Sequence, residues 1–394
     1  MRVGFVVLFR LLYRTVFKSR GTHARFTVRR FFVMAFFIPA FVTLQILHRI
    51  AFKLDDLFFG AYKNVAIKEP VFIVGIPRSG TTFLHRVMSK DTETFTTLKL
   101  WELIFAPSIV ERKVVFGLRW LDGMVGHPGY KILAALENRI FAEVRKIHRV
   151  SLFEPEEDDL ILFPIFASIF LLFPFPFEEE LWHHATFDRD TPEADRRAIM
   201  SFYRECVRRH LYVHGPEKRF LSKNPAFSPK TDSLLEFFPD ARVICNVRNP
   251  YSSVPSLMSF LSFSWNRFDN DPKGDRFREM IMRLAGHWYR MPMERLPKWP
   301  KGQYAFAKYD GLTATPRKLI SELYENLNIP LTEPFRMVLA TEEEKAKGYV
   351  SKHNYSLDKY GLTADMIREA YKDVFEYYGF ETEIEEVQQV YRAV

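Results

Sequence analysis

The sequence predicts an α/β fold in which a parallel sheet is covered by helices on both faces. Three observations support this prediction. Short apolar runs alternate with longer helix-like segments between residues 70 and 330, as in a doubly covered sheet. These runs are almost continuously apolar, which is typical of buried parallel strands. The first run leads at once into a glycine-rich turn and then a helix-like segment, the arrangement of a P-loop.

Four strands and four helical regions follow from these patterns. The strands are expected at 71–74, 219–223, 241–248 and 303–309, and the helical regions at 108–150, 191–213, 316–326 and from about 363 onward. Their alternation places them in one P-loop-like domain, because no repeat or linker divides the region. We therefore expect a single catalytic domain over residues 61–394.

Residues 1–60 have a different composition and are expected to form membrane-associated helices. Residues 3–18 are apolar except for three basic residues spaced by four, which lie on one helix face. Residues 31–47 carry no charge, but this length is at the short end of the roughly 17–25 residues that span a bilayer, and Pro39 interrupts it. A type II signal anchor, a monotopic helix and a helix packed on the protein itself all remain open.

A second uncharged run, at residues 160–177, follows the acidic stretch EPEEDD at 154–159. Because it contains three prolines, we do not expect this run to form one uninterrupted spanning helix. We expect this run to cap a hydrophobic acceptor tunnel, to make a second membrane contact, or to form a buried core segment.

Charge and cysteine content narrow the class of partner. The net charge of +8 favours an anionic ligand or surface. Nucleic acid is not expected, because no zinc-finger, RGG or RNP-type pattern occurs. The two cysteines, Cys206 and Cys245, are far apart in segments that look regular, so neither a disulfide framework nor a metal site is expected.

The loop Gly75–Thr82 has the glycine spacing of a P-loop, with one important change. Thr81 stands where a nucleotide triphosphatase carries its lysine, and the cation is instead Arg78, inside the loop. A guanidinium fork can bridge two oxyanions. This arrangement favours a ligand with a shorter anionic tail than ATP and a reaction that needs no magnesium.

The string PRSGTT in this loop resembles the 5′-phosphosulfate loop of sulfotransferases that use 3′-phosphoadenosine 5′-phosphosulfate (PAPS). Arg248-Asn249-Pro250 after a later strand, with Ser256 eight residues after Arg248, is similar to the family's 3′-phosphate motif. Residues 70–380 resemble the bacterial-type branch, which is related to the tyrosylprotein sulfotransferases. The fold that the resemblance implies is the P-loop-like α/β domain expected above.

The resemblance also implies roles for individual residues. The donor PAPS would be held by seven of them: Arg78, Ser79, Gly80, Thr81, Thr82, Arg248 and Ser256. Lys223 matches the family's lysine in "lysine–any–proline" and would stabilise charge on the transferring group together with Arg78. Ser351, Lys352 and His353 would fold over the donor.

A base must accept the proton of the acceptor. Cytosolic sulfotransferases carry a histidine just after the lysine, but this chain has Pro225-Ala226-Phe227 there. Glu102, in LWELI, matches the glutamate that tyrosylprotein sulfotransferases use, and it is the expected base. The alternatives are Glu156, Glu157, His183 and His184.

The expected function is therefore transfer of a sulfuryl group from PAPS to a hydroxyl or amine of a lipid-like or membrane-presented acceptor, with no metal. A carbohydrate acceptor is the alternative, and a P-loop nucleotide kinase is the alternative of another class. The bacterial-type resemblance favours a membrane-associated enzyme at the cytoplasmic face, with a type II Golgi protein as the other possibility. The sequence leaves the oligomeric state open.

Overall fold

The computed structural model describes residues 2–145, 150–346 and 357–382. Within them, parallel strands form a sheet of five in the order β2-β3-β1-β4-β5. The strands are β1 (Val71–Gly75), β2 (Phe95–Thr96), β3 (Arg219–Lys223), β4 (Arg242–Val247) and β5 (Tyr304–Lys308). The expected parallel sheet is confirmed, and β2 is a short edge strand that the sequence patterns did not reveal.

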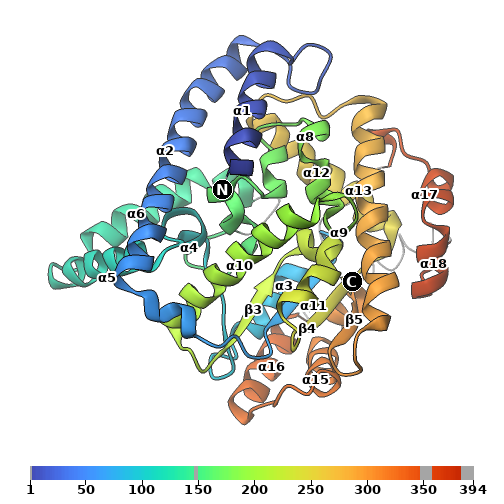
Figure 1. The fold of residues 1–394 in the computed structure, drawn as a ribbon. Helices are drawn as coiled ribbons and strands as arrows, with labels where there is room; N and C mark the ends of the chain where they lie inside the picture. Colours follow the sequence, from blue (N-terminus) through green and yellow to red (C-terminus); the bar gives the residue numbers. More distant parts are fainter. Residues whose placement is uncertain (1, 146–149, 347–356, 383–394) are drawn as a thin grey trace.

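Helices cover both faces of this sheet (Figure 1). They are α1 (Arg2–Phe17), α2 (Val28–Phe58), α3 (Thr81–Met88), α4 (Leu100–Phe105), α5 (Ile109–Met124), α6 (Pro128–Ile140), α7 (Ala142–Arg145), α8 (Glu178–Ala185), α9 (Phe187–Asp190), α10 (Glu193–His214), α11 (Thr231–Phe237), α12 (Pro250–Arg267), α13 (Gly274–Arg295), α14 (Tyr309–Ala314), α15 (Pro316–Asn326), α16 (Glu333–Ala346), α17 (Ala364–Ala370) and α18 (Lys372–Tyr378).

Alternate side chains of the strands feed two hydrophobic cores. Phe72 and Val74 belong to the larger core, which α10, α11, α12 and α13 complete. Val71 and Ile73 belong to the smaller core, with α3, α15 and α16. Because successive strand residues point to opposite faces, a strand buried on both faces must be apolar throughout, as β1 is.

Helix α2 runs along the outside of the catalytic region (Figure 1). It is continuous through Pro39. Near its start, Arg30 donates to the carbonyl of Phe268 over 2.8 Å, and near its end Asp55 accepts from Arg209 over 3.0 Å. By length and composition alone, α2 is the one helix among the described residues that could cross a membrane. Its contacts with the protein extend from its first turn to its last.

The uncharged run at 160–177 is built mainly from two 3₁₀ helices, η2 (Asp158–Ile165) and η3 (Ile169–Leu172). Ile161, Leu162 and Leu171 are buried in the larger core. Prolines in this run break regular α-helical bonding, since proline has no N–H to donate. The run is therefore packed into the core, and several of its residues also line the cavity described below.

Candidate active site

The residues expected to act together lie at one edge of the sheet. Arg78 follows β1, Lys223 ends β3, Arg248 follows β4 and Tyr309 follows β5. Because these strands are parallel, their carboxyl ends meet at the same edge, where open α/β sheets bind ligands. The fold thus brings together residues that are up to about 230 positions apart in the sequence.

The loop after β1 needs glycine at two positions. Gly75 has φ +122°, and a Cβ there would lie 2.0 Å from the carbonyl oxygen of Asn246. Gly80 has φ +86°, and a Cβ there would lie 3.1 Å from the ring of Tyr309. Arg78 has φ +72° although it is not glycine, a conformation that costs of order 1–3 kcal/mol and is often found at ligand sites.

The hydroxyl and amide groups of this loop have two roles: some fix the shape of the loop, and others face the cavity. The hydroxyl of Ser79 is buried and donates to the carbonyl of Ile76 over 2.6 Å, so it fixes the shape of the loop. Gly80, Thr81 and Thr82 line the adjoining cavity. They also begin α3, whose first amides have no partner within the helix and carry the positive end of its dipole. Such a helix start favours an anion.

The two motifs at the sheet edge contact each other directly. Nε of Arg78 donates to the hydroxyl of Ser256 over 3.1 Å. One terminal nitrogen of Arg248 donates to the carbonyl of Arg78 over 3.0 Å, and its guanidinium lies 4.0 Å from the ring centre of Tyr309. The structure therefore brings the residues of both sequence motifs into one cationic group beside the cavity.

Lys223 is fully buried and held by two carboxylates. Its Nζ lies 3.0 Å from Glu156 and 2.9 Å from Glu157. Burial alone would lower the pKa of Lys223, but the two carboxylates raise it above its ordinary value. Both glutamates also line the cavity. The ammonium group is thus kept charged, and it positions two carboxylates at the cavity wall.

The geometry argues against the role expected for Glu102. Its carboxylate is 1% exposed and lies outside the cavity wall. One oxygen lies 2.7 Å from His214 and 3.2 Å from Arg112. Burial alone would raise the pKa of Glu102, but Arg112, His210 and His214 hold that pKa well below its usual range. In this arrangement the carboxylate faces Arg112 and the histidines and does not face the cavity.

The same group has metal-like geometry, since the ligand atoms of Glu102, His210 and His214 lie within 4.8 Å of one another. The fully buried guanidinium of Arg112 already supplies the counter-charge there. Burial lowers the pKa of His210 to about 4, so that histidine is neutral. The group is accounted for as a buried ion pair between α4, α5 and α10.

The histidine alternatives lie away from the cavity wall. His184 is buried in α8, and burial lowers its pKa well below the ordinary value. Burial likewise lowers the pKa of His183. Ser351, Lys352 and His353 lie outside the described residues.

A cavity of about 1500 Å³ begins at the loop and extends under α2. At one end it is lined by the loop, Arg248 and Tyr309. The rest of the wall is largely apolar, from α2, η3 with the residue that follows it, and α12: Val33, Phe36, Phe37, Phe41, Leu44, Phe170, Phe173, Leu257, Phe260 and Leu261. Phe36 is 81% exposed although it lines the cavity, so the apolar end opens outward at α2. This volume exceeds the ~300–1,000 Å³ of ordinary ligand pockets.

Sequence reasoning did not identify two features of this site. Tyr309 supports Arg248, and its only signal was its position as the last residue of a predicted strand. The contact of Lys223 with Glu156 and Glu157 joins segments 66–67 residues apart. Glu156 and Glu157 were named as alternative bases, but the acidic run gave no sign that Lys223 holds them at the cavity wall.

Comparison with known proteins identifies relatives of one kind. The model of the sulfotransferase family matches residues 70–333. The omega-hydroxy-beta-dihydromenaquinone-9 sulfotransferases of Mycobacterium bovis and Mycobacterium tuberculosis are each 23% identical over 343 residues, covering 81% of this chain and 77% of theirs.

Two crystal structures share the fold. Sulfotransferase STF1 of Mycobacterium tuberculosis is 20% identical, with a TM-score of 0.69 over 94% of this chain and 92% of its own. Sulfotransferase STF9 of Mycobacterium avium is 17% identical, with the same TM-score over 86% and 84%. At these identities, the likeness shows the fold.

Proposed function

The chain belongs to the sulfotransferase family, and from this premise we propose that it transfers a sulfuryl group from PAPS to a hydroxyl group of a lipid-like acceptor. The observation that carries the proposal is the cavity, which joins an anion-binding end to a long apolar end. One end suits a phosphorylated nucleotide and the other suits a hydrocarbon chain. An enzyme acting on a soluble sugar would need a polar wall instead.

The residues at the anion-binding end fit PAPS. The loop amides and Arg78 would hold the 5′-phosphosulfate, and Arg248 and Ser256 the 3′-phosphate, through charge-assisted hydrogen bonds. The contacts of Arg78 with Ser256 and of Arg248 with the carbonyl of Arg78 support this assignment. They hold both anion-binding groups in position before the donor arrives, which limits the ordering cost of binding.

Two side chains are proposed to assist transfer. The donor supplies the electrophilic sulfur and leaves as 3′,5′-ADP. Lys223 does not itself line the cavity, but it is paired with Glu156 and Glu157, which do. Its fixed positive charge would act from behind these carboxylates on negative charge that develops beside the loop. Glu157, which lines the cavity and is more exposed than Glu156, accepts the proton of the acceptor hydroxyl. Glu156 keeps Lys223 in place.

The acceptor is proposed to be a hydroxyl group on a long apolar chain. The rings and branched side chains from α2, η3 and α12 would bury the chain and leave the hydroxyl at the loop. The menaquinone-type acceptor in the name of the Mycobacterium relatives is of this chemical class. The opening at Phe36 gives the chain a way out of the cavity.

We further propose that α2 lies on a membrane surface without crossing it. Both ends of α2 are bonded to the catalytic region, and a spanning helix could not keep these contacts. Its outward side carries exposed rings, including Phe31, Phe32 and Phe36. A helix with this pattern is suited to the interface of a bilayer, and it would deliver a lipid to the cavity.

The donor assignment predicts a selective ligand effect on thermal unfolding. We expect 3′,5′-ADP to raise the melting temperature of the full chain, since a ligand at a hundredfold its Kd stabilises by about 2.7 kcal/mol. 5′-ADP lacks the 3′-phosphate and should give a smaller shift at the same concentration. A shift with ATP and magnesium, but none with 3′,5′-ADP, would contradict the assignment.

A further inference from the structure

The helical hairpin formed by α5 and α6 projects from the body of the protein with its apolar residues exposed (Figure 1). In α5 only Ile109 and Arg112 are buried, and in α6 only Glu137. Twelve large hydrophobic residues of the hairpin are exposed: Val114, Phe116, Leu118, Trp120, Leu121, Met124, Val125, Tyr130, Ile132, Leu133, Leu136 and Ile140. Exposed apolar residues gathered in this number on one hairpin indicate an interaction site.

The charges of the hairpin have an uneven distribution. Its acidic side chains have local partners. Asp122 accepts hydrogen bonds from the amides of Gly129 and Tyr130 over 2.7 and 3.0 Å, and Glu137 forms an ion pair with Arg145. The exposed ionic side chains are basic, namely Lys113, Arg119, Lys131 and Arg139. An apolar surface interspersed with basic side chains is complementary to anionic lipid headgroups.

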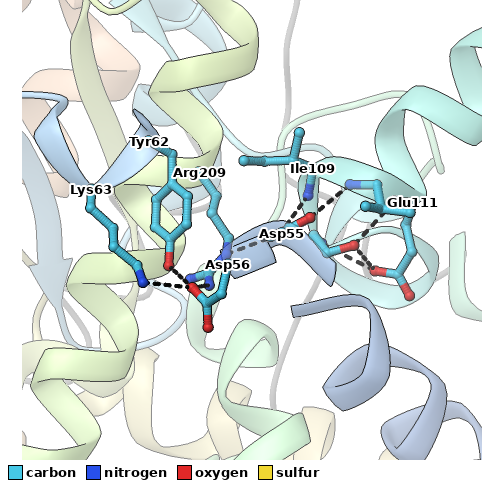
Figure 2. Close-up of polar contacts among 9 residues, drawn as sticks. Asp55, Asp56, Tyr62, Lys63, Ile109, Glu111 and Arg209 are labelled. Carbon is cyan, nitrogen blue, oxygen red and sulfur yellow. Dashed lines mark hydrogen bonds and ion pairs between the residues drawn. The ribbon is translucent and has the colours of Figure 1, made fainter. Parts of the chain in front are cut away.

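The base of the hairpin is fixed to α2 (Figure 2). The buried carboxylate of Asp55 accepts from the first amides of α5, at Ile109 and Val110, both over 2.9 Å. The same carboxylate accepts from Arg209 of α10, and Glu111 contacts His48 over 2.6 Å. These contacts fix the start of α5, and so the base of the hairpin, against α2.

We propose that the α5–α6 hairpin inserts into the interface of an anionic bilayer and is a membrane-docking element separate from α1 and α2. On α5 the exposed apolar positions cover more than half of the circumference, at about 100° per residue. Lipid can surround a helix in this way, whereas docking of another protein usually covers one face. Ile46, Leu47 and Ile50 of α2, the helix to which the hairpin is anchored, are exposed as well.

The basic residues fit the same placement. The long stems of lysine and arginine lie along apolar surface while their charged ends reach the headgroups. The proposal does not rest on the identity of the donor or the acceptor. It concerns binding of the protein to lipid, and it can be tested without turnover.

Trp120 reports the insertion directly. It is 67% exposed, whereas Trp265, Trp288 and Trp299 are buried and Trp101 and Trp182 are half-buried. The full chain is mixed with vesicles of phosphatidylcholine and phosphatidylglycerol whose acyl chains are brominated, and its tryptophan emission is compared with that of W120F. We expect the brominated acyl chains to quench the emission of Trp120 in the wild-type protein. W120F lacks this residue, so its emission should be quenched much less. Both proteins can still bind through α1 and α2, so the difference isolates the hairpin.

A charge-reversed pair provides a second readout. R119E/K131E should bind these vesicles at least about tenfold more weakly, because each basic residue near an anionic surface contributes to the binding free energy. R368E/K372E changes the same charge on α17 and α18, and should bind nearly as the wild type does. The proposal would be overturned if Trp120 stayed unquenched when the protein is bound to the vesicles. It would also be overturned if Trp120 were already shielded in a stable dimer without lipid.

Discussion

Glu157→Gln is expected to lower kcat for sulfuryl transfer by about 10²–10⁴-fold, the usual contribution of a positioned general base. The glutamine keeps the size of the side chain but cannot accept the acceptor proton. Glu157 lines the cavity and lies 2.9 Å from Lys223. Thermal stabilisation by 3′,5′-ADP should be nearly unchanged, because the anion-binding end is intact. Single-turnover rates with labelled PAPS measure the effect.

Two matched substitutions separate this role from others. Glu156→Gln should lower turnover less, because Glu157 still holds Lys223. Glu102→Gln leaves Arg112 buried without its counter-charge, and breaking a buried pair costs about 3–5 kcal/mol. We therefore expect it to lower the melting temperature, while the protein that remains folded keeps its kcat. Full activity of Glu157→Gln, with loss of kcat in folded Glu102→Gln, would reverse the assignment of the base.

Arg248→Ala is expected to weaken binding of 3′,5′-ADP by about 10–150-fold. Hydrogen bonds to charged groups contribute about 1.5–3 kcal/mol each, and 1.4 kcal/mol is a factor of ten. The substitution also frees the loop, since Arg248 donates to the carbonyl of Arg78. Calorimetric titration of the full chain with 3′,5′-ADP gives the change in Kd.

A second nucleotide, 5′-ADP, serves as the control for this substitution. 5′-ADP has no 3′-phosphate, so its Kd should change much less in Arg248→Ala than that of 3′,5′-ADP. Arg248→Lys keeps the charge but loses the planar contact with Tyr309, and should give an intermediate Kd. An equal loss of affinity for both nucleotides would place Arg248 away from the 3′-phosphate.

Local sequence signals were sufficient for the core of the fold. β1 and its loop are contiguous in the chain, and Gly75 and Gly80 have the positive φ angles that this loop requires. β3, β4 and β5 are short apolar runs with helices between them. The two-residue strand β2 has no pattern of its own, because it depends on pairing with β3.

The site was less accessible to sequence reasoning, because ion pairs between distant segments decide which charged groups face the ligand. Glu102 sits at a motif position, but Arg112 and His214, which enclose it, come from α5 and α10. Glu157 was only one of four alternative bases, and its contact with Lys223, from a distant strand, is what holds it at the cavity wall. Burial and pairing of this kind follow from tertiary packing, which spacing does not encode.

Transfer of label from PAPS tests the central proposal most directly. The full chain is incubated with PAPS labelled in its sulfuryl group and a membrane-lipid extract, and the organic and aqueous phases are analysed separately. We predict labelled product in the organic phase, formed by the wild type and greatly reduced with Glu157→Gln. Label found only in water-soluble glycans, or no transfer to any hydroxylated lipid, would contradict the proposal.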